Sequence, residues 1–111
     1  MQAAQNSPNR SYYLSFEPRP DYLLARVSGT AASLSTSRAY WNDIAREVGS
    51  RQAKRLLVWE DFDGMISTQD TFILVNELCR LKSLVTLRLA LLDEYLDQLD
   101  RNKLGEMIAN N

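Results

Sequence analysis

Leu56-Leu57-Val58-Trp59-Glu60-Asp61-Phe62-Asp63-Gly64 is the most informative stretch of this chain. Its first four residues form a short continuous apolar run, which is typical of a strand buried within a parallel sheet. The acidic residues and the glycine that follow predict a loop over residues 60–66. Because neighbouring parallel strands need long crossover connections, we expect helices on either side of this strand.

The segment before this strand predicts an amphipathic helix. Ser33–Thr36 supplies N-cap candidates, and the helix is expected to run to about Val48 and to be closed by Gly49. Its apolar residues recur at helical spacing. They predict a buried stripe made of Tyr40, Trp41, Ile44, Ala45 and Val48.

The segment after the strand predicts a second helix, capped by Ser67 or Thr68 and ending near Leu81. This helix carries apolar residues on most of its faces, and we therefore expect it to be deeply packed. Cys79 lies in it and is interpreted as an inert core thiol, because a reactive cysteine needs an electropositive, partly exposed setting.

The rest of the chain predicts strands at both ends of this unit. Residues 12–16 and 22–28 read as an antiparallel hairpin, and residues 86–92 read as a further strand. A last helical stretch is expected to start at Asp93 or a neighbour and to continue to about Ala109. Residues 1–11 are polar and predict a flexible N-terminal tail.

The order of predicted elements, β-β-α-β-α-β-α, defines an α/β fold class. We expect a single small domain over residues 12–111. Its sheet is expected to be mixed but mainly parallel, with four to five strands, an N-terminal β-hairpin and about three packing helices.

Composition excludes several classes of function. The chain has 111 residues with 13 basic and 14 acidic side chains, and this balance argues against a nucleic-acid partner. It has no His and one Cys, so it cannot build a His-based triad, a His-ligated zinc site or an internal disulfide. No apolar run approaches the roughly 20 residues of a membrane span, and no signal-type segment is present. We therefore expect a cytoplasmic protein with no cofactor and no resident metal.

Charge is unevenly distributed along the chain. Residues 1–55 hold 8 basic and 4 acidic side chains, a net charge of +4, whereas residues 56–111 hold 5 and 10, a net charge of −5. Because small α/β folds interleave their halves, we expect this asymmetry to vanish in space. The alternative is a bipolar surface that steers a charged partner.

Two local motifs could carry chemistry. Asp61 and Asp63 follow an apolar strand, as in phosphatase-type magnesium sites, but the expected interpretation is a plain acidic turn. Ser67 and Thr68 stand at a helix N-terminus, where a hydroxyl cap is expected. A phosphate there would add about two negative charges beside acidic neighbours, and it could expel a docked partner.

Several strings resemble the STAS (anti-sigma-factor antagonist) domains, and in particular the STAS/SEC14-related bacterial proteins. Residues 22–29 resemble the strand-then-glycine opening of that family. Residues 56–59, the loop that ends in Ser67-Thr68, the helix behind it and residues 87–92 follow the family's order of elements. The resemblance covers about residues 12–111 and implies a SpoIIAA-like fold.

The resemblance implies a domain with no catalytic activity that binds a regulatory protein partner and is switched at a serine or threonine. That position falls at Ser67 or Thr68, although the family's Asp-Ser-(Ser/Thr)-Gly string is replaced here by Ile66-Ser67-Thr68-Gln69. The expected binding surface comprises Asp61, Asp63, Gly64, Gln69 and Asp70.

The family also has a final strand and helix beyond Asn111. Three explanations for the absence of these elements stay open: a shortened chain, a shortened reading frame, or a sheet edge that a partner chain completes. An unpaired sheet edge favours a homodimer. The alternative function is a small-molecule or lipid-binding domain that uses an apolar pocket between sheet and helices.

Overall fold

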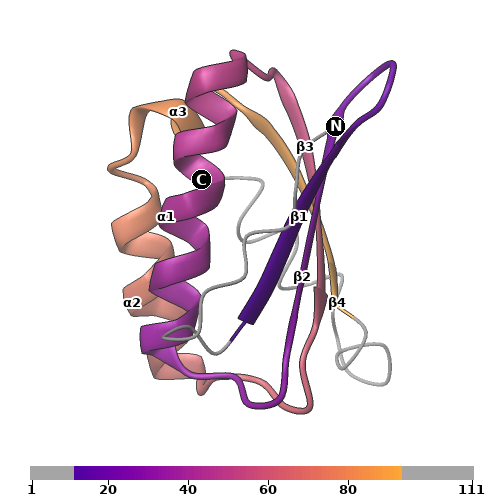
Figure 1. Ribbon diagram of the computed structural model, residues 1–111. Helices are drawn as coiled ribbons and strands as arrows, with labels where there is room; N and C mark the ends of the chain where they lie inside the picture. The colour runs from indigo at the N-terminus through magenta and orange to yellow at the C-terminus, as the bar shows by residue number, and fades with distance from the viewer. Residues whose placement is uncertain (1–11, 94–111) are drawn as a thin grey trace.

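The strand predicted from residues 56–59 is the central element of the sheet. The computed structural model describes residues 12–93, in which this strand is β3 (Arg55–Asp61) and lies between two parallel neighbours. The sheet order is β1-β2-β3-β4 (Figure 1). The hairpin of β1 (Tyr12–Pro18) and β2 (Leu23–Gly29) is antiparallel, and β4 (Arg88–Asp93) forms the other side. The α/β class and the mixed, mainly parallel sheet are therefore confirmed.

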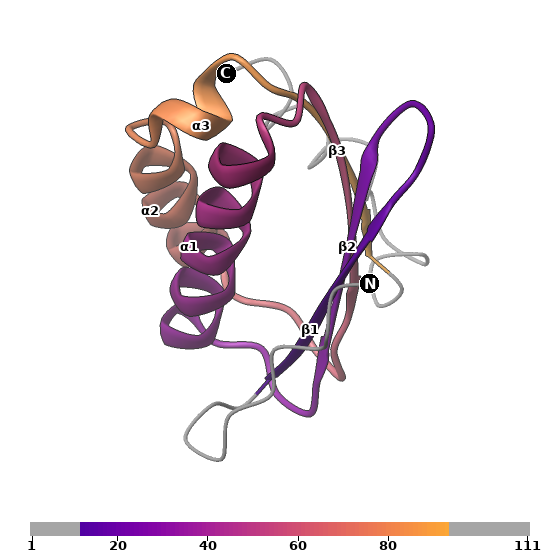
Figure 2. The same ribbon diagram turned by 45° about the horizontal axis from the view of Figure 1, so that its top comes forward.

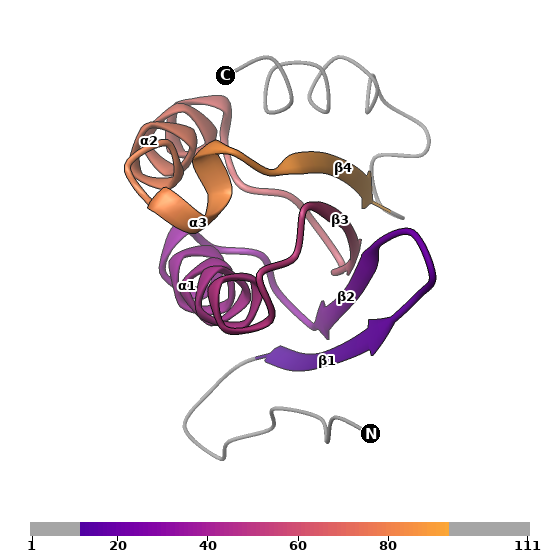
Figure 3. The same ribbon diagram turned by 90° about the horizontal axis from the view of Figure 1, so that it is seen from above.

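All three helices lie on one face of the sheet, as Figure 2 and Figure 3 show. They are α1 (Leu34–Arg51), α2 (Thr68–Leu78) and the single turn α3 (Lys82–Val85). The pairing of the strands places inward-facing residues of all four strands side by side, in rows that run across the sheet. The side chains of these rows pack against the helices. The central row is Phe16, Ala25, Val58 and Leu91.

Helix α1 follows its prediction closely at its start and along its buried face. The Ser33 hydroxyl accepts a hydrogen bond from the Thr36 amide at 3.1 Å, and the predicted stripe from Tyr40 to Val48 is buried. The helix ends later than expected, because Gly49 continues in helical conformation. Gln52 ends it instead, with a left-handed φ of 54° and an amide that donates to the carbonyls of Val48 and Gly49.

Helix α2 and the residue that follows it correct three predictions. The helix ends at Leu78 rather than near Leu81, and after a short break the chain forms α3. It is also covered on one face only: Leu74, Val75 and Leu78 are buried, but Phe72 and Ile73 are exposed. Cys79, expected in the core, is exposed as well, because it follows Leu78 and turns away from the sheet.

Some predictions fall outside residues 12–93. These are the N-terminal tail of residues 1–11, the last helix to Ala109, and the strand and helix implied beyond it. The described α3 is a different element from that predicted last helix. None of the helices in residues 12–93 has the length and apolarity that crossing a bilayer requires.

Candidate functional site

The start of α2 has the capping geometry that the sequence predicted, and Ser67 rather than Thr68 makes the cap. The Ser67 hydroxyl accepts a hydrogen bond from the Asp70 amide at 3.0 Å. The Ser67 carbonyl accepts from the Thr71 amide and hydroxyl, both at 2.9 Å. Ser67 and Thr68 are both exposed, so either hydroxyl is accessible to a modifying enzyme.

An apolar patch lies on the outward face of α2. At about 100° per residue, Gln69, Phe72, Ile73 and Asn76 fall on one side of the helix, opposite Leu74 and Leu78. Phe72 is 54% exposed and Ile73 is 36% exposed, and Met65 in the preceding loop is 46% exposed. We call Gln69, Phe72, Ile73 and Asn76 the α2 face. Large apolar side chains grouped in this way mark an interaction surface more often than scattered ones do.

The α2 face is held in place by a contact with α1. The Arg38 guanidinium donates to both carboxylate oxygens of Glu77, at 2.9 and 2.7 Å. This hydrogen-bonded pair lowers the pKa of Glu77 and raises that of Arg38. Both side chains are partly exposed to solvent, so the pair orients α2 more than it stabilises the fold.

The five residues predicted to bind a partner lie on two different faces. Asp63 is exposed in the loop, and Gln69 and Asp70 lie in the first turn of α2. Asp61 instead lines a hollow on the opposite face of the sheet, beside Tyr13 and Trp59. Gly64 lines a cavity behind the loop, where a Cβ atom would meet nothing within 4 Å.

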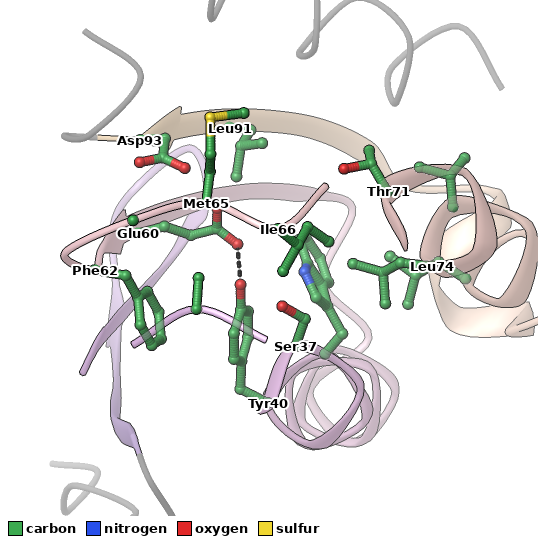
Figure 4. Close-up of a pocket in the computed structure, with 15 residues that line it drawn as sticks. Ser37, Tyr40, Glu60, Phe62, Met65, Ile66, Thr71, Leu74, Leu91 and Asp93 are labelled. Atoms are coloured by element: carbon green, nitrogen blue, oxygen red, sulfur yellow. Dashed lines mark hydrogen bonds between the residues drawn. The ribbon is translucent and has the colours of Figure 1, made fainter. Parts of the chain in front are cut away.

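A buried carboxyl cluster lies beneath the loop, and the sequence analysis missed it. Glu60 at the end of β3 and Asp93 at the end of β4 are register partners that point toward α1 (Figure 4). The Tyr40 hydroxyl donates a hydrogen bond to Glu60. The sequence predicts a loop at Glu60 and a helix cap at Asp93 or a neighbour, whereas both residues lie in strands. Strand alternation from Leu56 through Val58 is the signal that places Glu60 inward.

Burial controls the protonation of this cluster. The pKa of Glu60 is raised to about 8, chiefly because burial disfavours the charged carboxylate and further because Asp93 lies beside it. The hydrogen bond from Tyr40 acts in the opposite direction. Burial and the Glu60 charge also raise the pKa of Tyr40 well above its usual value. Glu60 is therefore mainly protonated at neutral pH.

The space between sheet and helices is small. The cavity in Figure 4 has a volume of about 60 Å³ and is lined by Tyr40, Glu60, Phe62, Leu74 and Asp93, among others. Ligand pockets usually span roughly 300–1,000 Å³, and one water occupies about 30 Å³ of liquid. At this volume the cavity holds about two waters and is too small for a lipid.

Comparison of the sequence with protein-family models and with curated proteins gives no match. In residues 12–93, no three Cys, Asp or Glu side chains are grouped so that they could hold a metal ion. Asp61 and Asp63, the carboxylates considered for magnesium, are both exposed.

Proposed function

We propose that this domain is a non-enzymatic, STAS-like interaction module that binds a regulatory protein through the α2 face. The observation that supports this proposal is the exposure of Phe72 and Ile73 on the side of α2 that faces away from the sheet. Burying these side chains against a partner would remove apolar area from water, at roughly 25 cal/mol per Å². Asp63 and Asp70 border the face and favour a partner with a basic rim around an apolar cleft.

The test compares two exposed faces of the same molecule. Three forms of the chain are immobilised: wild type, the double variant Phe72→Ser/Ile73→Ser, and Tyr13→Ser. Each is incubated with lysate of its source cell, and the retained proteins are identified by mass spectrometry. Tyr13 is a matched control because it is 48% exposed on the opposite face of the sheet. We expect a protein that wild type and Tyr13→Ser retain and that the double variant loses, and the purified pair should reproduce this pattern.

The outcomes separate clearly. Circular dichroism should show all three proteins folded, since substitutions of exposed side chains usually change stability by less than about 0.5 kcal/mol. Retention of the same proteins by the double variant would contradict the proposal. If Tyr13→Ser instead lost the retained protein, the interaction surface would lie on the open face of the sheet, opposite the helices.

We further propose that phosphorylation at Ser67 or Thr68 weakens this complex. A phosphate at Ser67 would lie three residues before Asp70, so it would add negative charge to a rim that is already acidic. Ser67→Asp and Ser67→Asn form a matched pair, because both residues cap helices well and differ in charge. Severalfold weaker binding by the aspartate variant alone is expected. Equal binding by both variants would remove the switch and leave the interaction role intact.

A further inference from the structure

Two arginines lie at facing register positions at the start of β3 and β4. Arg55 and Arg88 are register partners in the parallel pair, and their side chains point to the outer face with Leu57 and Ala90. Like charges directly opposite each other destabilise a sheet. The ion pairs of residues 12–93 involve Arg19, Arg38, Arg46 and Arg51, and they include neither Arg55 nor Arg88.

The two arginines border a hollow of about 310 Å³ on the surface of the sheet. Its lining is otherwise apolar and consists of Tyr22, Leu56, Leu57, Leu89 and Ala90. The small side chain of Ala90, between Arg88 and Leu92 on the outward side of β4, leaves this space open. Lys54 precedes Arg55, and its carbonyl accepts a hydrogen bond from the Arg88 amide at 3.0 Å. One end of the hollow is therefore cationic and its floor is apolar.

We propose that this hollow binds a small organic anion, in which a carboxylate or phosphate group is attached to an apolar body. Arg55 and Arg88 both line the hollow, and each guanidinium is a planar donor fork that matches carboxylate and phosphate oxygens in bidentate geometry. The apolar body of the ligand covers Leu57 and Ala90. The bound anion also relieves the repulsion between Arg55 and Arg88.

This site goes beyond the proposed partner surface and is independent of it. Arg55 begins β3, whereas the loop that leads to the α2 face follows the other end of the same strand (Figure 1). All three helices lie on the inner face of the sheet, so none of them covers the hollow (Figure 3). A variant in one site therefore leaves the other in place, and the two proposals can fail separately.

The experiment titrates the full chain with probes that separate the charged group from the apolar body. Octanoate and octyl phosphate carry both parts, octyl glucoside lacks the charge, and inorganic phosphate lacks the apolar body. Binding is followed by calorimetry and by amide chemical shifts. We expect octanoate or octyl phosphate to bind and to shift the amides of residues 55–57 and 88–90, with little response to the other two probes.

Variants then assign the binding to the hollow. Arg55→Gln and Arg88→Gln should each weaken binding by about tenfold, since a charge-assisted hydrogen bond contributes roughly that factor or more. Ala90→Phe fills the hollow and should abolish binding. Arg80→Gln is the matched control, because Arg80 is exposed, makes no ion pair in residues 12–93 and lies outside the hollow. It should bind like wild type.

Several results would overturn the proposal. These are no binding of either anionic probe, equal affinity for octyl glucoside, equal affinity for inorganic phosphate, or unchanged affinity in both arginine variants. If the chain bound phosphatidylglycerol vesicles but none of the monomeric probes, the proposal of a small-molecule site would be wrong. The arginines would then belong to a surface that binds membranes. Thermal unfolding supplies an independent check: Arg55→Gln should leave the midpoint unchanged or raise it, and a lowered midpoint would assign the arginine pair a structural role.

Discussion

At the scale of a single residue, Glu60 has the most direct consequence for stability. Its pKa is about 8 in the folded chain against an ordinary value of 4.5, so between these limits the unfolded chain loses a proton that the folded chain keeps. The contribution of Glu60 to stability is therefore fully present below pH 4.5 and declines as the pH rises toward 8. In this range it lowers the free energy of unfolding by up to roughly 1.4 kcal/mol per pH unit.

Glu60→Gln should remove this decline, because a glutamine keeps a hydrogen-bonding group beside Tyr40 and Asp93 but does not ionise. Chemical unfolding between pH 5 and pH 9 measures the effect, and we expect the variant to be more stable than wild type at the alkaline end. Asp63→Asn is the control, since Asp63 is exposed, and its profile should follow that of wild type. A wild-type slope that persists in Glu60→Gln would assign the titration to another group.

At the scale of the elements, the cap of α2 has an energetic role that is separate from any modification. Ser67 satisfies the Asp70 amide, whereas Thr68 is the first residue inside the helix. Ser67→Ala should therefore lower the free energy of unfolding by about 1 kcal/mol. Thr68→Ala should leave it nearly unchanged. Denaturant unfolding of the two variants measures this difference, and an unchanged free energy of unfolding in Ser67→Ala would show that the Ser67 hydroxyl contributes nothing to the cap.

The elements also show what the sequence could predict. Helix α1 was predictable because polar residues separate its apolar positions, so that one stripe stands out from Tyr40 to Val48. In α2 four apolar residues follow one another from Phe72 to Val75, and no period reveals which two face the sheet. The acidic side chain of Glu60 concealed its place in the strand. Glu60 is buried next to Asp93, its register partner in β4. Only the tertiary fold determines that these two residues are paired.

At the scale of the whole molecule, residues of one charge sign stand at each end of the β3–β4 pair. Both β3 and β4 begin with an arginine and end with an aspartate, at Arg55 and Asp61 and at Arg88 and Asp93. Because these strands are parallel, the charges at equal ends add rather than cancel. Each half of the chain contributes one of these two arginines, so this separation of charge runs along the strands and not between the two halves. The cationic end carries the proposed anion site, and at the acidic end β3 leads into the loop that precedes α2.

The same architecture predicts how stability is distributed through the molecule. Within residues 12–93, β2 and β3 have hydrogen-bonded neighbours on both sides, whereas β4 pairs on one side. Helix α3 is a single turn with no side-chain cap and no buried residue. Native-state hydrogen exchange should therefore be slowest in β2, β3 and the buried face of α1, and faster in β4 and α3. Amides of Arg88–Asp93 that exchange as slowly as those of β3 would contradict this gradient, and they would indicate that a further strand or a second copy pairs with β4.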